Sequence, residues 1–316
     1  MVEVFGKKAT RYGFGEALIE LGERDPKIFV LGADTAASVA IDGFQKKFPD
    51  RFLNVGIAET NLIGMAAGLA VAGFIPFAAT YGVFAAGRPW EQIRTTVCYS
   101  NLNVKIGGSH SGLMVGPDGA THQALEEIAI MRCLPKMTVI SPCDLVETKK
   151  ATMASAYIDG PVYIRYGREN IPIITKQETP FEVGKANVVR EGKDVAIFAT
   201  GTMVYEALMA ADILESKGIK ARVINIHTIK PIDEKAIIDA AKECGAIVTA
   251  EEHQIFAGFG SAVAEVIVRN CPVPMEFVGV NDTFGESGEP MDLMIKYGLK
   301  DVNIVKAVEK VLKRKG

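Results

Sequence analysis

Glu59 is the only charged residue in a run of small and apolar residues that extends from Asn54 to Gly73. Gly73 and Pro76 interrupt the run before it reaches the roughly 20 apolar residues that a membrane-spanning helix requires. We therefore predict a buried helix whose small residues let a second backbone approach closely. These small residues are Gly64, Ala66, Ala67, Gly68 and Ala70.

The position of Glu59 has two interpretations. A carboxylate beside an apolar helix is costly to bury unless another group pairs with it, which indicates a catalytic or binding role. The alternative is structural, because the helix dipole stabilises an acidic residue in the first turn. This run of residues alone leaves both interpretations open.

A second group of polar residues lies in the glycine-rich segment 110–122, which contains His110, Asp118 and His122. The segment follows an apolar run at residues 104–106, and loops that follow strands in α/β folds commonly bind ligands. Several polar side chains on such a loop favour a polyhydroxylated substrate. Two alternatives stay open: metal ligation, although the spacing matches no familiar ligand pattern, and a structural turn whose histidines hydrogen-bond to neighbouring groups.

Alternating strands and helices are expected to position these residues. The predicted strands are residues 28–31, 52–55, 104–106, 138–140, 162–164, 195–198, 221–224, 246–249 and 275–277. A stretch with two prolines, residues 170–180, predicts a linker, and a lysine-rich helix is predicted from about residue 302 to 313. The pattern indicates an α/β protein of two domains, residues 1–175 and 183–316, each a mainly parallel sheet flanked by helices.

The composition is that of an ordinary globular protein. The chain has 316 residues, of which 48% are hydrophobic and 23% charged, and its formal net charge is −3. This charge provides no general attraction for nucleic acid or for an anionic membrane. The N-terminus lacks the apolar core of a signal peptide, and the five cysteines are scattered and odd in number. We therefore expect a cytoplasmic protein with reduced cysteines.

Five segments together resemble the transketolase family of thiamine-diphosphate enzymes, in the family's order and close to its spacing. They are Ala9–Arg11, Gly32–Ser38, Gly56–Glu59, His110–His122 and Arg168–Asn170. The resemblance covers nearly the whole chain and implies a pyrimidine-binding domain followed by a C-terminal domain, the second half of a full-length transketolase. The implied activity is transfer of a two-carbon ketol unit between sugar phosphates in the pentose phosphate pathway.

One family feature has no match. Thiamine enzymes hold the diphosphate through Mg²⁺ with a Gly-Asp-Gly stretch and an asparagine some way after it. The only candidate here, Gly116–Gly119, lacks this motif. The resemblance therefore implies a split enzyme, active only when a partner chain carries the diphosphate and the Mg²⁺, with no metal held by this chain. The small residues after Glu59 and the family's arrangement of sites imply a dimer of this chain within a heterotetramer.

The resemblance also implies residues that contact the cofactor. The cofactor's amino group can act as a base if the pyrimidine nitrogen N1′ contacts a carboxyl group in an apolar pocket, and Glu59 matches that position. Tyr81 and Phe84 match an aromatic platform for the ring. Many transketolases have a third aromatic residue where this chain has Gly87, which leaves the pocket roomier. Asp34 matches an aspartate near the cofactor, but it could equally cap the following helix.

Further matches imply contacts with the substrate. His110 and His122 would polarise or exchange protons with the donor's carbonyl and hydroxyl groups, as catalytic residues. Asp118 would accept a hydrogen bond from a hydroxyl. The phosphate-contacting arginines of the family match Arg11 and Arg168, whose guanidinium groups suit phosphate, and the hydroxyl partner of the family matches Ser38. Glu251 and Glu252 match no catalytic group of the family, and we interpret both as structural.

Two other functions stay open. A β-subunit of a 2-oxo-acid dehydrogenase has similar size, domain order and a glutamate-bearing helix, but its substrate carries no sugar phosphate for Arg11 and Arg168 to bind. The related deoxyxylulose-phosphate synthases share the Asp-Gly-x-Thr-His string of residues 118–122 but lack a histidine at the position of His110. A non-catalytic regulatory subunit is the third possibility. The sequence does not identify the partner chain, the preferred sugars or the final stoichiometry.

Overall fold

A sheet of seven strands organises the N-terminal part of the computed structural model, which describes residues 2–315. The strand order is β12–β6–β7–β5–β4–β2–β3. Its parallel strands are β2 (Ile28–Gly32), β3 (Phe52–Asn54), β4 (Ile75–Tyr81), β5 (Lys105–Ser109), β6 (Thr138–Ile140) and β7 (Val162–Arg165). Most of these strands are nearly continuous apolar runs, as expected of parallel strands that are covered on both faces.

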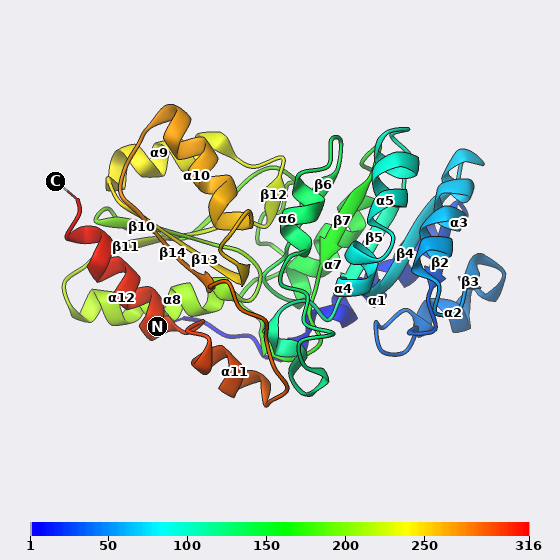
Figure 1. Ribbon diagram of the computed structural model, residues 1–316, viewed down its shortest axis with the longest axis horizontal. Coiled ribbons are helices and arrows are strands. Elements are labelled where there is room, and N and C mark those ends of the chain that lie inside the picture. Colours follow the sequence, from blue (N-terminus) through cyan, green and yellow to red (C-terminus); the bar gives the residue numbers. More distant parts are fainter. Residues whose placement is uncertain (1, 316) are drawn as a thin grey trace.

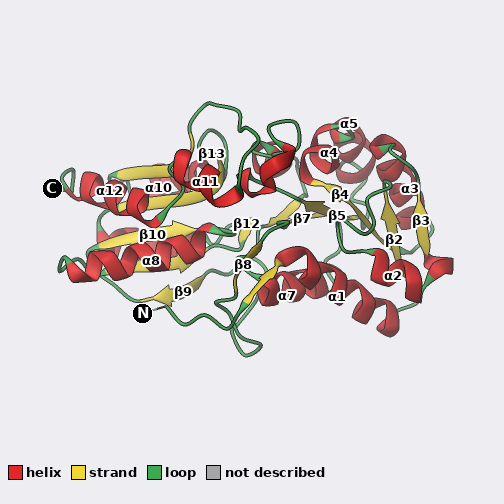
Figure 2. Ribbon diagram, turned by 90° about the horizontal axis from the view of Figure 1, so that it is seen from below, coloured by secondary structure: helices red, strands yellow, loops and turns green. Residues whose placement is uncertain are grey.

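Helices cover both faces of this sheet (Figure 2). One face carries α1 (Thr10–Arg24), α2 (Asp42–Lys47) and α7 (Leu145–Ser155). The other carries α3 (Glu59–Val71), α4 (Gly82–Gly87) and α5 (Trp90–Gln92), while α6 (Glu127–Arg132) precedes β6. Short helical segments η1 (Pro49–Arg51), η2 (Ile93–Cys98) and η3 (Leu113–Asp118) connect these elements.

The C-terminal domain lies beside the first along the long axis of the molecule (Figure 1) and contains a five-stranded sheet in the order β14–β13–β10–β11–β9. Its strands are β9 (Asn187–Arg190), β10 (Val195–Ala199), β11 (Ala221–Asn225), β13 (Ile247–Gln254) and β14 (Met275–Val280). Only β9 runs antiparallel to its neighbour. The helices are α8 (Met203–Ser216), α9 (Glu234–Cys244), α10 (Phe259–Asn270), α11 (Pro290–Lys296) and α12 (Asp301–Leu312).

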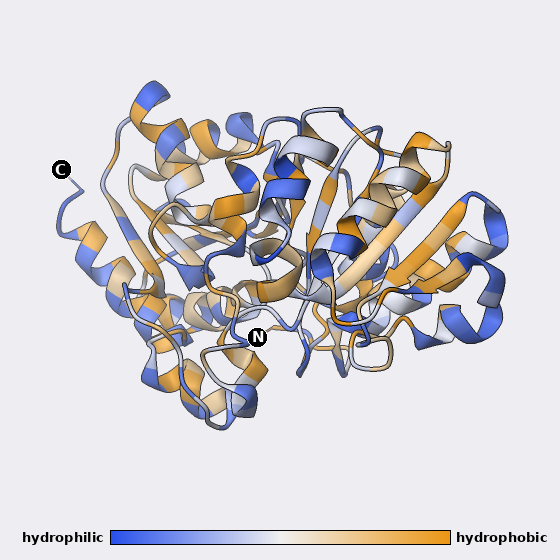
Figure 3. Ribbon diagram, turned by 45° about the vertical axis from the view of Figure 1, so that its right-hand side comes forward, coloured by the Kyte–Doolittle hydropathy of each residue, from blue (hydrophilic) through white to orange (hydrophobic). Residues whose placement is uncertain are grey.

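The two domains share structure across their boundary. Strand β12 (Thr228–Lys230) belongs to the C-terminal half of the chain but pairs antiparallel with β6 at the edge of the larger sheet. Ile229 of β12 packs in the same buried cluster as Val139 of β6. Hydrophobic residues concentrate on the strands of both sheets, as the hydropathy colouring shows (Figure 3). The domains are therefore joined by a continuous apolar core.

The predicted fold class is confirmed: two domains of mainly parallel sheets are flanked by helices. The predicted linker at 170–180 begins with a short strand, β8 (Asn170–Pro172), which pairs with β1 (Lys7–Ala9). The lysine-rich helix is α12. No helix within residues 2–315 is long and apolar enough to span a bilayer. The exact domain boundaries at 175 and 183 remain predictions.

The helix that follows Glu59 is only half buried in the single chain, so the prediction of a buried helix was partly wrong. Ala66 and Ala67 are covered by the sheet, whereas Gly64 and Gly68 are exposed. A Cβ atom added to either glycine would meet no atom within 4 Å. One face of α3 therefore has the small, open surface on which another backbone could pack.

Candidate active site

Most of the candidate residues meet at one edge of the larger sheet. Asp34 follows β2, Glu59 comes shortly after β3, Tyr81 ends β4, His110 follows β5 and Arg168 follows β7. The carboxyl ends of parallel strands face the same edge, so the sheet topology brings these side chains together although they are distant in sequence.

Glu59 is the first residue of α3 and is buried, with 4% of its surface exposed. Both of its carboxylate oxygens accept hydrogen bonds from Nη1 of Arg88, at 3.0 and 2.9 Å. The Arg88 guanidinium also lies over the ring of Phe84, 3.9 Å from its centre. Glu59 is therefore both a helix-start acid and a paired buried carboxylate, so the two interpretations are compatible.

Arg88 was not among the predicted site residues. Arg88 follows Phe84 by four residues around α4, a spacing that places two side chains on the same helical face. That spacing was the one signal in the sequence that could have identified the contact with Phe84. The contact with Glu59 joins residues 29 positions apart and depends on the fold.

Four rings form a continuous group beside this ion pair. Tyr81 lies 4.4 Å from His110 and 5.9 Å from His122, measured between ring centres. Phe84 lies 5.2 Å from His122 and 6.1 Å from Tyr81. The predicted aromatic platform and the predicted catalytic histidines therefore occupy one site.

The environment of His110 keeps its imidazole neutral. Burial is the main cause that lowers the pKa of His110 to about 3, and the positive charges of Arg11 and Arg168 lower it further. Nδ1 of His110 is hydrogen-bonded to the hydroxyl of Ser109 at 2.8 Å, and Nδ1 of His122 to that of Thr121 at 2.9 Å. Since neither Nε2 has a hydrogen-bond partner among the described residues, both rings can offer this atom to a ligand.

The glycines before His110 have a packing role. A Cβ atom on Gly108 would lie 2.1 Å from the buried hydroxyl of Tyr163 on the adjacent strand β7. Only glycine at position 108 therefore leaves room for the side chain of Tyr163 against β5. The close packing fixes the end of β5, from which His110 extends with a positive φ of 55°.

The two candidate phosphate ligands, Arg11 and Arg168, lie near enough to His110 for their charges to lower its pKa. Nη1 of Arg11 donates to the backbone carbonyl of Ser38 at 2.9 Å. Nη1 of Arg168 donates to Oδ2 of Asp118 at 3.3 Å and to the carbonyl of Val115 at 3.2 Å. Both arginines place positive charge near His110, and Arg168 also pairs with the carboxylates of Asp118 and Glu169. Ser38 contributes its carbonyl to Arg11, and the predicted role of its hydroxyl remains untested.

Asp34 does not cap the next helix. Its backbone N–H donates to Oδ1 of Asn54 at 2.9 Å, and Nδ2 of Asn54 donates back to Oδ1 of Asp34 at 3.1 Å. Helix α2 begins at Asp42 with Ile41 at its N-cap. The Asp34–Asn54 pair ties the ends of β2 and β3 together just before the turn that leads to Glu59.

The residues at this edge fit the pyrimidine end of thiamine diphosphate. The Arg88 guanidinium is planar and bears N–H groups; it stacks on Phe84 and donates to the buried carboxylate of Glu59. A planar nitrogen heterocycle at the same place would have an aromatic face and a carboxyl group to contact. Within residues 2–315, no group of three or more His, Cys, Asp or Glu side chains could hold a metal ion.

Two family models match the chain. "Transketolase, pyrimidine binding domain" matches residues 6–173, and "Transketolase, C-terminal domain" matches residues 184–304. A "Putative transketolase C-terminal section" from Methanocaldococcus jannaschii is 46% identical over 318 residues, covering 99% of this chain and 100% of that protein.

Two further relatives cover nearly the whole chain. A "6-deoxy-6-sulfo-D-fructose transketolase subunit" from a Clostridium species is 44% identical over 300 residues, covering 95% of this chain and 93% of that protein. A solved structure described as "Split gene transketolase, inactive beta4 tetramer" is 50% identical, with a TM-score of 0.92 and coverage of 98% of this chain and 99% of that chain.

Proposed function

The chain belongs to the transketolase family, and on this premise we propose that it is the C-terminal subunit of a split, thiamine-diphosphate-dependent transketolase. The enzyme transfers a two-carbon ketol unit from a ketose phosphate to an aldose phosphate in the pentose phosphate pathway of the cytoplasm. An N-terminal partner chain holds the diphosphate and the Mg²⁺. This chain supplies a pyrimidine-binding domain, residues 1–175, and a C-terminal domain, residues 183–316.

One arrangement supports this proposal above all. The buried carboxylate of Glu59 lies beside a group of aromatic and imidazole rings, and two arginines, Arg11 and Arg168, lie near His110. A carboxyl group next to a ring platform suits the cofactor, and imidazoles beside positive charge suit a phosphorylated sugar. A 2-oxo-acid dehydrogenase would need the carboxylate and the aromatic rings, but it would not need the imidazoles and arginines that suit a phosphorylated sugar.

Bound thiamine diphosphate would supply a nucleophilic carbon that carries the ketol unit. Glu59 would hold a hydrogen bond to N1′ of the pyrimidine, and Phe84 and Tyr81 would pack against the ring. Because Arg88 now contacts both Glu59 and Phe84, its guanidinium must leave this position when the ring binds. Movement of Arg88 is feasible because 47% of its side chain is exposed.

The polar residues of the loop would orient the sugar. His110 is neutral near pH 7, so it acts as a hydrogen-bond donor or acceptor toward the donor's carbonyl or hydroxyl groups rather than as a fixed cation. His122 would contact the same groups through its Nε2. Asp118 would accept a hydrogen bond from a hydroxyl, and Arg11 and Arg168, with Ser38, would bind the terminal phosphate.

The printed descriptions of the relatives support the need for a second chain. The M. jannaschii relative is described as a C-terminal section, and the solved relative as an inactive assembly of beta subunits. We propose likewise that copies of this chain associate with one another but remain inactive without the partner. A regulatory, non-catalytic role is disfavoured because Glu59, both loop histidines and both arginines are present at one site.

Reconstitution tests the proposal. The chain is co-expressed with candidate partners that carry the diphosphate motif, and ketol transfer from xylulose 5-phosphate to ribose 5-phosphate is measured. Activity is expected only when both chains are present and should disappear with Glu59→Gln. Transfer by this chain alone, or equal activity of the Glu59→Gln complex, would contradict the proposal. A sulfonated ketose belongs in the donor panel because one relative is described as acting on 6-deoxy-6-sulfo-D-fructose.

A further inference from the structure

We propose that Glu252 of the C-terminal domain is a positioning residue for the substrate loop, by which we mean residues 110–122. The inference rests on the proposed function, because it takes this loop as the segment that binds the sugar. Glu252 would act at a distance from the substrate, by fixing the backbone that carries Asp118. The C-terminal domain would then contribute to sugar recognition although it supplies no group that touches the sugar.

Glu252 connects the two domains through its carboxylate. It lies near the end of β13 and is 2% exposed. Its Oε1 accepts a hydrogen bond from the backbone N–H of Met114 at 2.8 Å, and its Oε2 accepts one from the hydroxyl of Thr202 at 2.8 Å. Met114 lies in η3, four residues before Asp118. One carboxylate therefore holds the substrate loop against the start of α8.

The backbone of the loop lies directly on this carboxylate. Gly112 has a φ of +87°, and a Cβ atom there would lie 2.2 Å from Oε1 of Glu252. No side chain fits between the loop and Glu252. The loop backbone at Gly112 is therefore in close contact with the carboxylate of Glu252.

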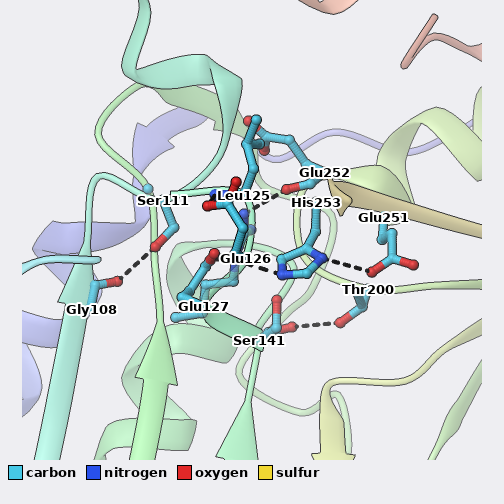
Figure 4. A network of polar contacts seen from close by, with 12 residues as sticks. Gly108, Ser111, Leu125, Glu126, Glu127, Ser141, Thr200, Glu251, Glu252 and His253 are labelled. Carbon is cyan, nitrogen blue, oxygen red and sulfur yellow. Dashed lines mark hydrogen bonds and ion pairs between the residues drawn. The ribbon is translucent and has the colours of Figure 1, made fainter. Parts of the chain in front are cut away.

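Other contacts with the C-terminal domain support the same loop. Nε2 of Gln123 donates to the carbonyl of Glu286 at 2.9 Å and to that of Leu113 at 3.2 Å. Just beyond the loop, the backbone N–H of Gln254 donates to the carbonyl of Leu125 at 2.9 Å. Figure 4 shows this region, with Glu252 and His253 of β13 beside Leu125, Glu126 and Glu127. The loop is thus held from the C-terminal domain both in its middle and at its end.

Arg165 is the cation near the buried carboxylate of Glu252, but its ion pair is with Glu127. Nη2 of Arg165 donates to the carbonyl of Glu252 at 2.7 Å, and Nε of Arg165 pairs with Glu127 at 2.5 Å. Burial raises the pKa of Glu252, and the positive charge of Arg165 opposes that effect. The carboxylate of Glu252 contacts the loop and Thr202 through its two hydrogen bonds, so we expect these bonds to determine the position of the loop.

Glu251 provides a matched control. It precedes Glu252 on the same strand and is 1% exposed. Its carboxylate accepts hydrogen bonds from the backbone N–H groups of Phe259 and Gly260 at the start of α10, at 2.7 and 2.8 Å, and not from the substrate loop. Replacing Glu251 with alanine should disturb the domain to a similar degree but leave the loop in place.

Hydrogen–deuterium exchange of the full chain tests the inference without any need for catalysis. In Glu252→Ala the Met114 N–H loses its partner, and amides of residues 112–119 should exchange at least about tenfold faster. Glu252→Gln can still accept from Met114 and donate to Thr202, so it should restore slow exchange. Unchanged exchange in Glu252→Ala, or the same increase in Glu251→Ala, would overturn the inference.

A kinetic cycle in the reconstituted complex tests the link to Asp118. If Glu252 acts through the position of Asp118, Glu252→Ala should lower kcat/KM by about tenfold in the parent enzyme but much less in an Asp118→Ala background. Glu251→Ala should change kcat/KM by the same factor in the parent enzyme and in the Asp118→Ala variant. If the loss of kcat/KM in the double variant equals the product of the losses in Glu252→Ala and Asp118→Ala, the two residues act independently and the inference is overturned. Absence of ketol transfer by the parent complex would instead contradict the proposed function, and the exchange experiment would still decide the role of Glu252.

A milder variant covers the case in which Glu252→Ala does not fold. Thr202→Val removes the hydroxyl that holds Oε2 of Glu252, and Thr202→Ser retains it. Faster exchange of residues 112–119 in Thr202→Val, with normal exchange in Thr202→Ser, supports the inference. Equal exchange in the two variants contradicts it.

Discussion

Replacing Arg168 with alanine should separate phosphorylated from unphosphorylated substrates. Nη1 of Arg168 contacts Asp118 and the carbonyl of Val115, and 32% of its side chain is exposed. Positive charge from Arg168 reaches His110, since it contributes to the lowered pKa of that ring. Under the proposed function, Arg168 would bind an anionic group of the sugar that His110 contacts.

The expected loss can be estimated from the contacts. Loss of a charge-assisted hydrogen bond to a phosphate amounts to about 1.5–3 kcal/mol, or roughly a 10- to 150-fold decrease in kcat/KM. The variant also breaks the ion pairs of Arg168 with Asp118 and Glu169, but a partly exposed ion pair contributes only about 0–1 kcal/mol. The phosphate contribution should therefore exceed the structural one.

The assay compares two substrate pairs in the reconstituted complex. With xylulose 5-phosphate and ribose 5-phosphate, Arg168→Ala should mainly raise KM. With hydroxypyruvate and an unphosphorylated acceptor, activity should be nearly unchanged. Arg168→Lys keeps the charge and should lose less. Arg190→Ala is a matched control, because Arg190 also pairs with carboxylates, those of Asp212 and Glu215, but belongs to the C-terminal domain.

Equal loss of turnover for both substrate pairs would refute the phosphate assignment. In that case Arg168 would serve to hold the loop through Val115 and Asp118, and its role would be structural. A large loss in Arg190→Ala would show that the assay responds to general destabilisation.

Three further predictions concern assembly and stability. The isolated chain should bind thiamine diphosphate weakly and show no turnover, and micromolar affinity in calorimetry with Mg²⁺ would contradict the split-enzyme proposal. The chain should form a dimer or a larger assembly in analytical ultracentrifugation through the exposed Gly64–Gly68 face of α3; a monomer at micromolar concentration would count against this. Burial raises the pKa of Glu147 from 4.5 to about 7, so the folded state binds an extra proton in this range and stability should fall as the pH rises through it. Glu147→Gln should remove about 3 kcal/mol of this pH dependence. The free energy of unfolding is measured with urea at several pH values between 5 and 8. If it changes with pH in Glu147→Gln as it does in the parent chain, Glu147 is not the source.

The sequence predicted the fold well where strands are buried on both faces. Such strands are short apolar runs, and β2, β6 and β10 were found within a residue or two of their observed ends. Strand β4 was missed because it follows α3 after three residues, so the two apolar runs merge. Strand β12 was missed for another reason: it has three residues and is defined by pairing with β6 in the other domain.

The site was predictable where topology alone positions a residue. Side chains that follow parallel strands meet at one edge, which is why Glu59, Tyr81 and His110 lie together. The contact of Arg88 with Glu59 and that of Glu252 with the loop backbone were not predicted, because both depend on tertiary packing. Glu252 and Met114 are 138 residues apart, and no local pattern relates a buried strand carboxylate to a distant backbone N–H.

The central claim is that Glu59 of this chain activates a cofactor whose diphosphate the partner holds. Its most direct test is the rate at which the C2 hydrogen of bound thiamine diphosphate exchanges with deuterium, measured by quenched-flow NMR in the reconstituted complex without substrate. Glu59→Gln should slow this exchange at least about 100-fold, because the amide cannot provide a carboxyl group to N1′. An unchanged exchange rate in Glu59→Gln, with the cofactor still bound, would contradict the claim.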